Sequence, residues 1–120
     1  MRKTLLALTG LTAVTAAAVL PVASAQADAS SWGAIAVSGN GDLGWAYNYD
    51  TETSASQAAE DKCGKSDCST ITTFQGCGAA AFSQSMNKYT GGYGATPIDA
   101  ENNAKWYPDS NIVRAAICND

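Results

Sequence analysis

After residue 31, short apolar stretches alternate with stretches of turn-forming residues. Residues 33–37 are small and apolar, and residues 43–49 (LGWAYNY) alternate in polarity. Between them lies SGNGD at 38–42, where Gly and Asn tolerate positive φ. This pattern predicts two strands joined by a hairpin. Residues 69–74 (STITTF), rich in Thr and β-branched side chains, predict a further strand.

Two other segments have helical periodicity. The first is predicted to begin near Thr53 or Ser54 and to end at Gly64. The second has Thr96 as its N-cap and ends at Pro108. The predicted apolar stripes consist of Ala55, Ala58, Ala59 and Cys63 in the first helix and of Ala100, Ala104 and Tyr107 in the second.

The order of these segments repeats once along the chain. Residues 32–38 (WGAIAVS) match residues 77–83 (CGAAAFS), and the same offset aligns the two predicted helices. The sequence therefore predicts two β-β-α-β half-repeats, at about 32–75 and 77–119. Together they would form a small disulfide-stapled α+β domain, with a mainly antiparallel sheet and two helices on one face.

Residues 1–29 predict a cleavable secretory signal. Arg2 and Lys3 give it a positive start, and residues 4–20 are uncharged and rich in Leu, Ala and Val. An uncleaved anchor is the alternative, but the apolar run is short for a membrane span of ~20 residues. Small residues at alternating positions allow cleavage after Ala25, Ala27 or Ala29. The remaining domain, residues 30–120, is expected to be secreted or held at the cell envelope, without membrane insertion.

All four cysteines lie in this domain, and an even number in an exported chain predicts two disulfides. We favour Cys63–Cys68, across a short turn between helix and strand, together with Cys77–Cys118. The two pairings that join Cys63 to Cys77 or to Cys118 remain open. Zinc binding is the rival interpretation, but the chain has no His and the C-x4-C spacing lacks a matching second pair. We therefore expect no metal or other cofactor.

The charge of the domain argues against several partners. If cleavage follows Ala25, the remaining chain has five Lys and Arg residues and all eleven Asp and Glu residues, so its net charge is negative. Binding to a phosphate backbone or an anionic lipid surface needs clustered Lys and Arg, and the chain has no such cluster. We expect no nucleic-acid partner, and the acidity favours solubility.

The absence of His also limits the catalytic chemistry. It excludes Ser-His-Asp and Cys-His machinery, and cysteines held in disulfides provide no thiolate nucleophile. Paired carboxylates, as in glycoside hydrolysis, are the remaining option. The candidates are Asp42, Asp50, Glu52, Glu60 and Asp61. Each also fits an ordinary place in a turn or on a helix surface, so we assign no catalytic residue.

Aromatic residues offer a possible binding surface. Trp45, Tyr47 and Tyr49 alternate and are predicted to share one strand face, while Tyr89 and Tyr93 lie on the corresponding strand of the second half. If this face is open, the rings could stack on sugars or anchor a protein partner. Otherwise the rings form the core under the helices, whose stripes of small Ala residues leave room for them.

Several short motifs, taken in order, carry a family resemblance. They are WGAIA at 32–36, GWAY at 44–47, CGKSDC at 63–68, CGA at 77–79 and YGAT at 93–96, followed by Cys118. The mature chain resembles the bacterial family catalogued as domain of unknown function 4189, small exported proteins frequent in high-GC Gram-positive bacteria. The resemblance implies secretion and one compact domain. It implies no activity and no catalytic residues.

These observations favour a non-enzymatic, monomeric binding module that acts outside the cell or at its envelope on an unknown extracellular protein or glycan. One alternative is an inhibitor or immunity protein against a secreted hydrolase, presenting a rigid loop near residues 84–90. A further alternative is a small carboxylate-dependent hydrolase of cell-wall polymers.

The disulfide prediction has a direct test. In the exported protein, we expect no cysteine to react with iodoacetamide until the protein is reduced, since all four thiols are paired. Intact-mass spectrometry before and after reduction measures this. Four thiols that are alkylated without reduction would contradict the prediction.

Overall fold

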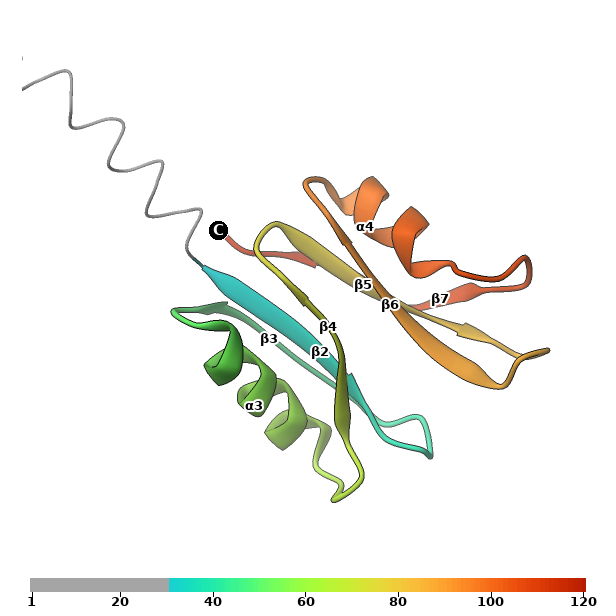
Figure 1. The fold of residues 1–120 in the computed structure, drawn as a ribbon, viewed down its shortest axis with the longest axis horizontal. Coiled ribbons are helices and arrows are strands. Elements are labelled where there is room, and N and C mark those ends of the chain that lie inside the picture. Colours follow the sequence, from blue (N-terminus) through green and yellow to red (C-terminus); the bar gives the residue numbers. More distant parts are fainter. Residues whose placement is uncertain (1–30) are drawn as a thin grey trace, which may run out of the picture.

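The computed structural model describes residues 31–120, and the predicted signal lies outside them. The elements, labelled as in Figure 1, are β2 (Trp32–Val37), β3 (Leu43–Tyr49), α3 (Glu52–Cys63), β4 (Ser69–Phe74), β5 (Cys77–Ser83), β6 (Lys88–Gly94), α4 (Pro97–Ala104) and β7 (Asn111–Cys118). Within the described residues, no helix is long and apolar enough to cross a membrane.

The six strands form two antiparallel three-stranded sheets, ordered β3-β2-β4 and β6-β5-β7. The expected α+β class is confirmed, and both halves have the order β-β-α-β with their first strand in the middle of the sheet. We expected one sheet with both helices on one face. The chain instead passes from β4 to β5 in the other sheet, so each helix covers a sheet of its own.

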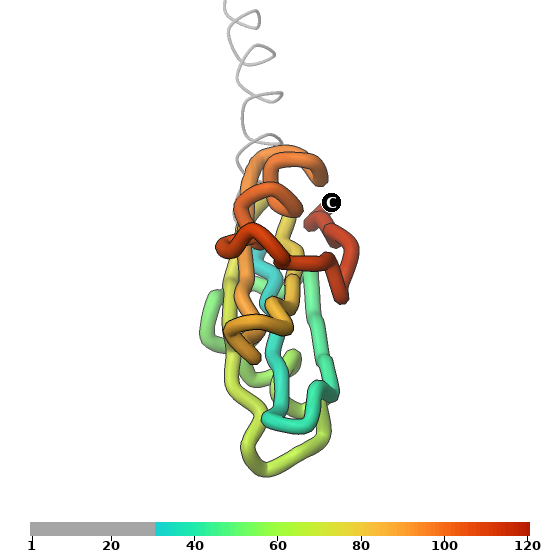
Figure 2. Tube along the Cα trace, turned by 90° about the vertical axis from the view of Figure 1, so that its right-hand side faces the viewer, coloured from blue at the N-terminus to red at the C-terminus, as the bar shows by residue number. Residues whose placement is uncertain are grey.

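The two sheets pack face to face, with one helix on each outer side (Figure 1). Successive side chains of β2 point to opposite faces of its sheet, and both faces are covered. Ala34 and Ala36 lie in the cluster under α3, whereas Ile35 lies between the sheets with Phe74 and Ala80. In the perpendicular view of Figure 2, strands of both sheets run along the long direction of the domain. The result is a four-layer α/β/β/α arrangement.

The ring of Phe74 is buried in the sheet interface, near the start of both central strands. A Cβ atom added at Gly33 of β2 or at Gly78 of β5 would collide with this ring. The two glycines are 45 positions apart, at equivalent places in the two halves. One aromatic side chain from the end of β4 thus fills the space that both glycines leave open.

Each helix lies very close to its sheet because the contacting residues are small. The buried residues of α3 are Ala55, Ala59 and Cys63. A Cβ atom at Gly44 of β3 would collide with the backbone of α3 at Ala59 and Cys63. The position of Gly44 therefore admits only hydrogen where another residue would place a side chain.

Two of the four helix ends differ from the predicted ones, whereas Gly64 ends α3 as predicted. Thr51 caps α3, with its Oγ1 accepting the N–H of Ser54 at 3.1 Å, so α3 starts before the predicted residues. Thr96 caps α4 as expected. However, α4 ends at Ala104, four residues before Pro108, and the hydroxyl of Thr90 donates to the Ala104 carbonyl at 2.6 Å. This hydrogen bond satisfies a backbone group that the helix end leaves open.

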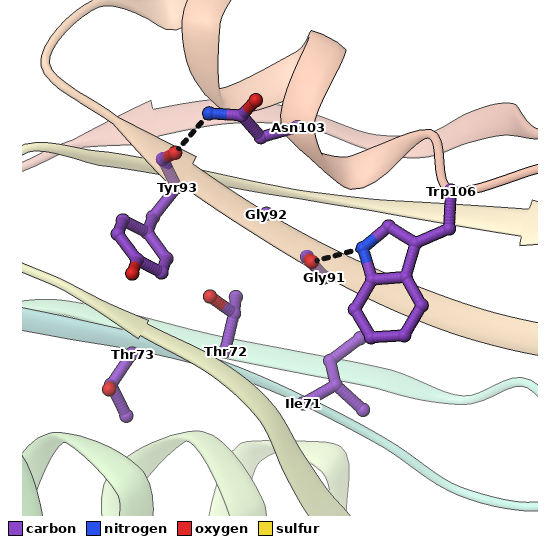
Figure 3. A pocket seen from close by; sticks show the side chains of 8 residues that line it. All are labelled: Ile71, Thr72, Thr73, Gly91, Gly92, Tyr93, Asn103 and Trp106. Atoms are coloured by element: carbon purple, nitrogen blue, oxygen red, sulfur yellow. Dashed lines mark hydrogen bonds between the residues drawn. The ribbon is translucent and has the colours of Figure 1, made fainter.

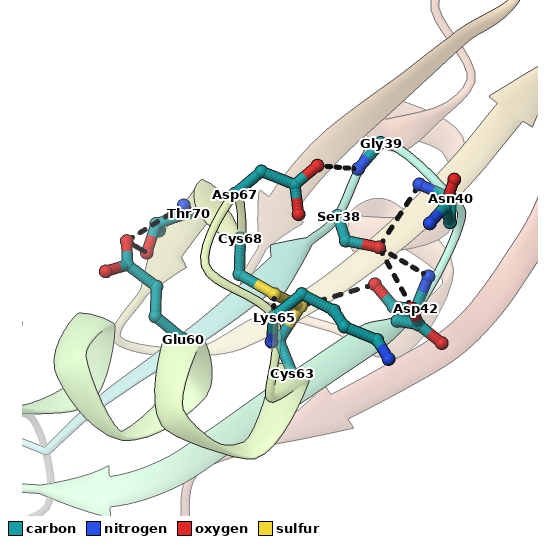
Figure 4. The surroundings of a disulfide bond; sticks show 10 residues. All are labelled: Ser38, Gly39, Asn40, Asp42, Glu60, Cys63, Lys65, Asp67, Cys68 and Thr70. Atoms are coloured by element: carbon teal, nitrogen blue, oxygen red, sulfur yellow. Dashed lines mark hydrogen bonds between the residues drawn. A yellow bond between two sulfur atoms is a disulfide. The ribbon is translucent and has the colours of Figure 1, made fainter.

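Both disulfides of the favoured pairing are present. Cys63–Cys68 closes the turn after α3 (Figure 4), and Cys77–Cys118 joins register partners on β5 and β7. Among the described residues there is no free cysteine. The Cys77–Cys118 bond closes a sequence separation of 41 residues. Because such a bond lowers the entropy of the unfolded chain, it stabilises the folded protein by roughly 4 kcal/mol.

The last two residues connect the two halves. The side-chain amide of Asn119 donates to the carbonyls of Phe74 and Gln75 at 3.1 and 2.9 Å, and its Oδ1 accepts the Asn48 N–H at 2.7 Å. Asp120 and Asn48 exchange two further hydrogen bonds. The C-terminus thus holds both the connector between the sheets and the end of β3.

Gly44 provides a test of the close helix packing. We expect Gly44→Ala to destabilise the oxidised protein by about 1–3 kcal/mol, because the obstacle is helix backbone that cannot rotate away. Gly39→Ala is the matched control, since its nearest neighbour is the flexible Asp67 carboxylate. Urea unfolding measures both variants. Equal stability of the two would contradict this account of the packing.

Candidate functional site

The predicted aromatic surface does not exist as one face. Trp45 lies beside the core between the sheets, where the Arg114 guanidinium stacks over it at 4.2 Å from the ring centroid. Tyr47 is 48% exposed. Tyr49, predicted on the same face, instead packs on the cluster under α3. The cause is Asn48, which has a φ of 65° within a register irregularity between β2 and β3.

The two tyrosines of the second half are also separated. Tyr89 packs its ring against Phe82, with centroids 4.6 Å apart, and reaches toward Gly41 in the hairpin of the first half. Tyr93 is 64% exposed and lines an open cleft. Of the five predicted aromatic residues, only Tyr93 faces this cleft.

This cleft, of about 470 Å³, lies where β4 and β6 cross. We call it the β4–β6 cleft. Figure 3 shows the rings of Tyr93 and Trp106 both pointing toward β4, with Thr72 between them. The eight lining residues are Ile71, Thr72 and Thr73 from β4, Gly91, Gly92 and Tyr93 from β6, Asn103 from α4, and Trp106.

Glycine allows the two strands to approach at the floor of the cleft. A Cβ atom at Gly91 would lie 2.7 Å from the Thr72 Cβ and 2.8 Å from the Ile71 carbonyl oxygen. A larger residue at Gly91 would therefore push β6 away from β4. This close approach of the two strands forms the floor of the cleft.

Hydrogen bonds to the backbone of β6 hold the walls of the cleft. The Nε1 of Trp106 donates to the Gly91 carbonyl at 3.1 Å, and the Nδ2 of Asn103 donates to the Tyr93 carbonyl at 2.8 Å. Trp106 nevertheless remains 59% exposed. Its ring is thus fixed in orientation with much of its surface open to solvent, as expected of a preformed binding surface.

The chemistry of the cleft is neutral. None of its eight lining residues carries a charge. Two aromatic rings provide flat apolar surface, and the hydroxyls of Thr72 and Thr73 and the amide of Asn103 provide polar groups. The Thr73 hydroxyl donates to Glu52 at 2.7 Å, which leaves its oxygen able to accept. Such a surface suits a ligand with apolar faces and hydroxyl groups but no charge.

Three of the five candidate catalytic carboxylates, Asp42, Glu52 and Glu60, have structural partners. Glu60 accepts from the N–H and hydroxyl of Thr70 at 3.1 and 2.8 Å, and Glu52 accepts from Thr73. These two glutamates are eight residues apart on one helix, on the order of 12 Å along its axis. Asp42 accepts from the Ser38 hydroxyl. Among residues 31–120, no group of three or more Cys, Asp or Glu could hold a metal ion.

A second exposed feature is the turn between β5 and β6, where the tip residue Met86 is 54% exposed. Asp109 clamps this turn by accepting from the Ser83 hydroxyl at 2.6 Å and the Ser85 N–H at 2.8 Å. These hydrogen bonds, the one from Ser83 foremost, lower the pKa of Asp109. These hydrogen bonds hold the turn in the region where the alternative of an inhibitor placed its loop, near residues 84–90.

Sequence reasoning did not identify Trp106 or Thr72. Trp106 lies in a stretch that we assigned to the second helix, where its neighbour Tyr107 was expected to be buried. A bulky Trp just before Pro108, with polar neighbours, is the signal that could have suggested an exposed ring.

Comparison with known proteins finds relatives of undetermined function. The model of a family described as domain of unknown function (DUF4189) matches residues 32–107. Protein Rv1269c of Mycobacterium tuberculosis is 37% identical over 91 residues, which cover 76% of this chain and 72% of that protein. Uncharacterized protein Rv1813c of the same organism is 41% identical over 73 residues, 61% of this chain and 50% of that protein.

A solved structure has the same fold. The NMR structure of Rv1813c matches this chain with a TM-score of 0.60 and 34% sequence identity, and the match covers 75% of this chain and 76% of the other. The similarity supports the α+β architecture described above.

The clamp at Asp109 leads to a prediction about pH. Because the folded pKa is lowered, the clamp stabilises the folded protein at neutral pH, and this stabilisation is lost as the pH falls through that lowered value. We expect Ser83→Ala to raise the pKa of Asp109 toward its ordinary range. The carboxyl ¹³C shift of Asp109, followed by NMR titration, measures it. An unchanged midpoint would contradict the role of Ser83.

Proposed function

The chain belongs to the family described as domain of unknown function (DUF4189), and we propose that it is a non-enzymatic extracytoplasmic protein that binds a neutral polysaccharide in the β4–β6 cleft. The observation that carries this proposal is the pair of exposed rings of Tyr93 and Trp106 on either side of Thr72, in a cleft lined by uncharged residues (Figure 3). The Trp106 ring is held by its hydrogen bond to the Gly91 carbonyl. Sugar rings offer C–H surfaces for stacking and hydroxyls for the threonine and asparagine side chains.

Two features support a role outside the cytoplasm. The two disulfides suit an oxidising compartment, and the N-terminal sequence has the composition of a secretory signal. In such a compartment, the accessible polymers include the glycans of the cell envelope. A binding role also fits the carboxylates, because Glu52 and Glu60 are engaged in holding the edge of β4.

The proposal predicts that binding depends on Trp106. We expect Trp106→Ala to weaken binding roughly tenfold or more, because stacking on this ring is lost, and Trp106→Phe to retain part of it. Tyr47→Ala is the matched control: it removes an exposed ring that lies outside the cleft. Isothermal titration with neutral gluco-, manno- and chito-oligosaccharides, and co-sedimentation with insoluble envelope polysaccharide, measure the affinities.

Two outcomes would refute the proposal. One is that none of these neutral glycans binds. The other is that Trp106→Ala and Tyr47→Ala weaken binding equally, which would indicate non-specific adsorption to aromatic surface. Because Trp106 donates one hydrogen bond to β6, circular dichroism and the unfolding midpoint of each variant are compared first.

A second candidate function is inhibition of a secreted hydrolase by the turn between β5 and β6. The observation in its favour is the clamp from Asp109, which bonds Ser83 and Ser85 in the turn that carries the exposed Met86. Affinity capture from culture supernatant, with wild type and Met86→Asp compared side by side, tests it. A hydrolase that is retained by wild type alone and loses activity in the complex would support inhibition.

A further inference from the structure

Each sheet has two outer strands, and in three of the four, side chains occupy outward backbone groups. On β4 the N–H of Thr70 donates to Glu60, and on β7 the N–H of Ala116 donates to Glu101 at 3.0 Å. On β6, as described, Trp106 and Asn103 cover two carbonyls. Such contacts block the pairing of a further strand.

The outer strand β3 differs over residues 43–47. The Asp42 carbonyl accepts from the Ser38 N–H, so the backbone of Asp42 points toward the neighbouring strand. Backbone groups point alternately toward and away from the paired strand, so those of Leu43, Trp45 and Tyr47 point away from β2. Among the residues that the structure describes, no hydrogen-bond partner within the chain is found for these outward groups. The next outward position, the N–H of Asn48, is already covered by Asn119.

A groove of about 350 Å³ runs along this free edge. Leu43, Trp45 and Tyr47 line it on the sheet side, and Lys62 from the last turn of α3 lines it on the helix side. The Arg114 guanidinium, stacked on Trp45, fixes the ring that forms part of this wall. The groove therefore combines unpaired backbone groups, an apolar wall and one cation.

We propose that this edge binds an extended polypeptide segment in which apolar and acidic side chains alternate. The segment would pair antiparallel with residues 43–47, as all strand pairs described here do. Residues that face the backbone of Trp45 and Tyr47 would direct their side chains to the same side as these rings. The intervening residues would direct theirs to the helix side, where Lys62 favours a carboxylate.

Charge favours this ligand over a second copy of the chain. The protein carries more acids than bases, yet Lys62 is the charged residue that lines the groove. Antiparallel pairing of two β3 edges would place both helices on one face of the joined sheet and bring two Lys62 side chains to one seam. Like charges oppose that arrangement.

The test uses defined peptides with the oxidised protein, followed by ¹⁵N NMR. The probe is acetyl-TEVEVET-amide, and acetyl-TKVKVKT-amide is its charge-reversed control. We expect the acidic probe to shift the amides of Leu43, Trp45 and Tyr47 and to slow their hydrogen exchange. Methylating the backbone nitrogens of the valines should abolish binding, because these N–H groups face β3. Methylating those of the glutamates should be tolerated, because they point away from β3.

Variants test the two parts of the proposal separately, the backbone pairing along β3 and the attraction of a carboxylate by Lys62. Tyr47→Pro removes an outward N–H at an edge position that tolerates proline, and it should abolish binding without unfolding the protein. Lys62→Glu should weaken the acidic probe roughly fivefold and favour the basic one, as expected for a partly exposed charge pair. Trp106→Ala, outside the groove, should leave peptide binding unchanged.

Three results would overturn the proposal. They are the absence of shifts at millimolar peptide, equal binding of both methylated peptides, and protection of the edge amides without peptide in a protein of doubled mass. The last result would assign the edge to a second copy of the chain. None of them bears on glycan binding in the β4–β6 cleft.

Discussion

The fold depends on the contact between the Phe74 ring and two glycines, Gly33 and Gly78. These positions lie on the central strands of the two sheets. Gly33 pairs with Phe74, the last residue of β4, and Gly78 pairs with Ile117, the residue before the last of β7. Hydrogen at both positions lets one ring fill the space between the sheets near the start of both central strands. Burial of an aromatic side chain here provides much of the apolar stabilisation that so small a core can offer, and it fixes how the sheets align.

Small residues extend the same principle to the outer layers. Alanines on α3 and α4 and glycines on β3 and β6 let the backbone of each helix pack directly against the backbone of its sheet. Under α3, the aromatic side chains of Trp32 and Tyr49 pack against this cluster of small residues and stay only partly buried. Trp45, Tyr47, Tyr93 and Trp106 lie between the sheets, at sheet edges or in open clefts. The close packing of the core thus places aromatic rings where ligands could reach them.

The two candidate binding surfaces follow from the ways in which the halves differ. In the first half Gly44 lies opposite Ala36 and α3 continues to Cys63, whereas in the second half Thr90 lies opposite Ala81 and bonds the end of the shorter α4. The shorter helix leaves Trp106 in a loop that can turn back to β6. The longer helix brings Lys62 beside the free edge of β3.

Local sequence signals predicted the elements well because they depend on nearby residues. Thr96 as a cap, the glycines of the first hairpin and the Cys63–Cys68 turn each act within a few positions. The prediction for Tyr49 was wrong because the irregularity at Asn48, with its positive φ, is not visible in an alternating pattern. Trp106 was missed because its orientation depends on a carbonyl of β6, 15 residues earlier in the chain.

The sequence alone predicted the half-domain plan of strands and helices, and it favoured the cysteine pairing that the structure shows without excluding the two others. Periodicity, turn residues and composition encode these properties locally. Only the tertiary structure decided that the strands form two stacked sheets and that the aromatic residues divide among different surfaces. It also left the β3 edge without a strand partner within residues 31–120. Those outcomes depend on which side chains meet across the sheet interface, and Gly33, Gly78 and Phe74 set that meeting from positions far apart in the chain.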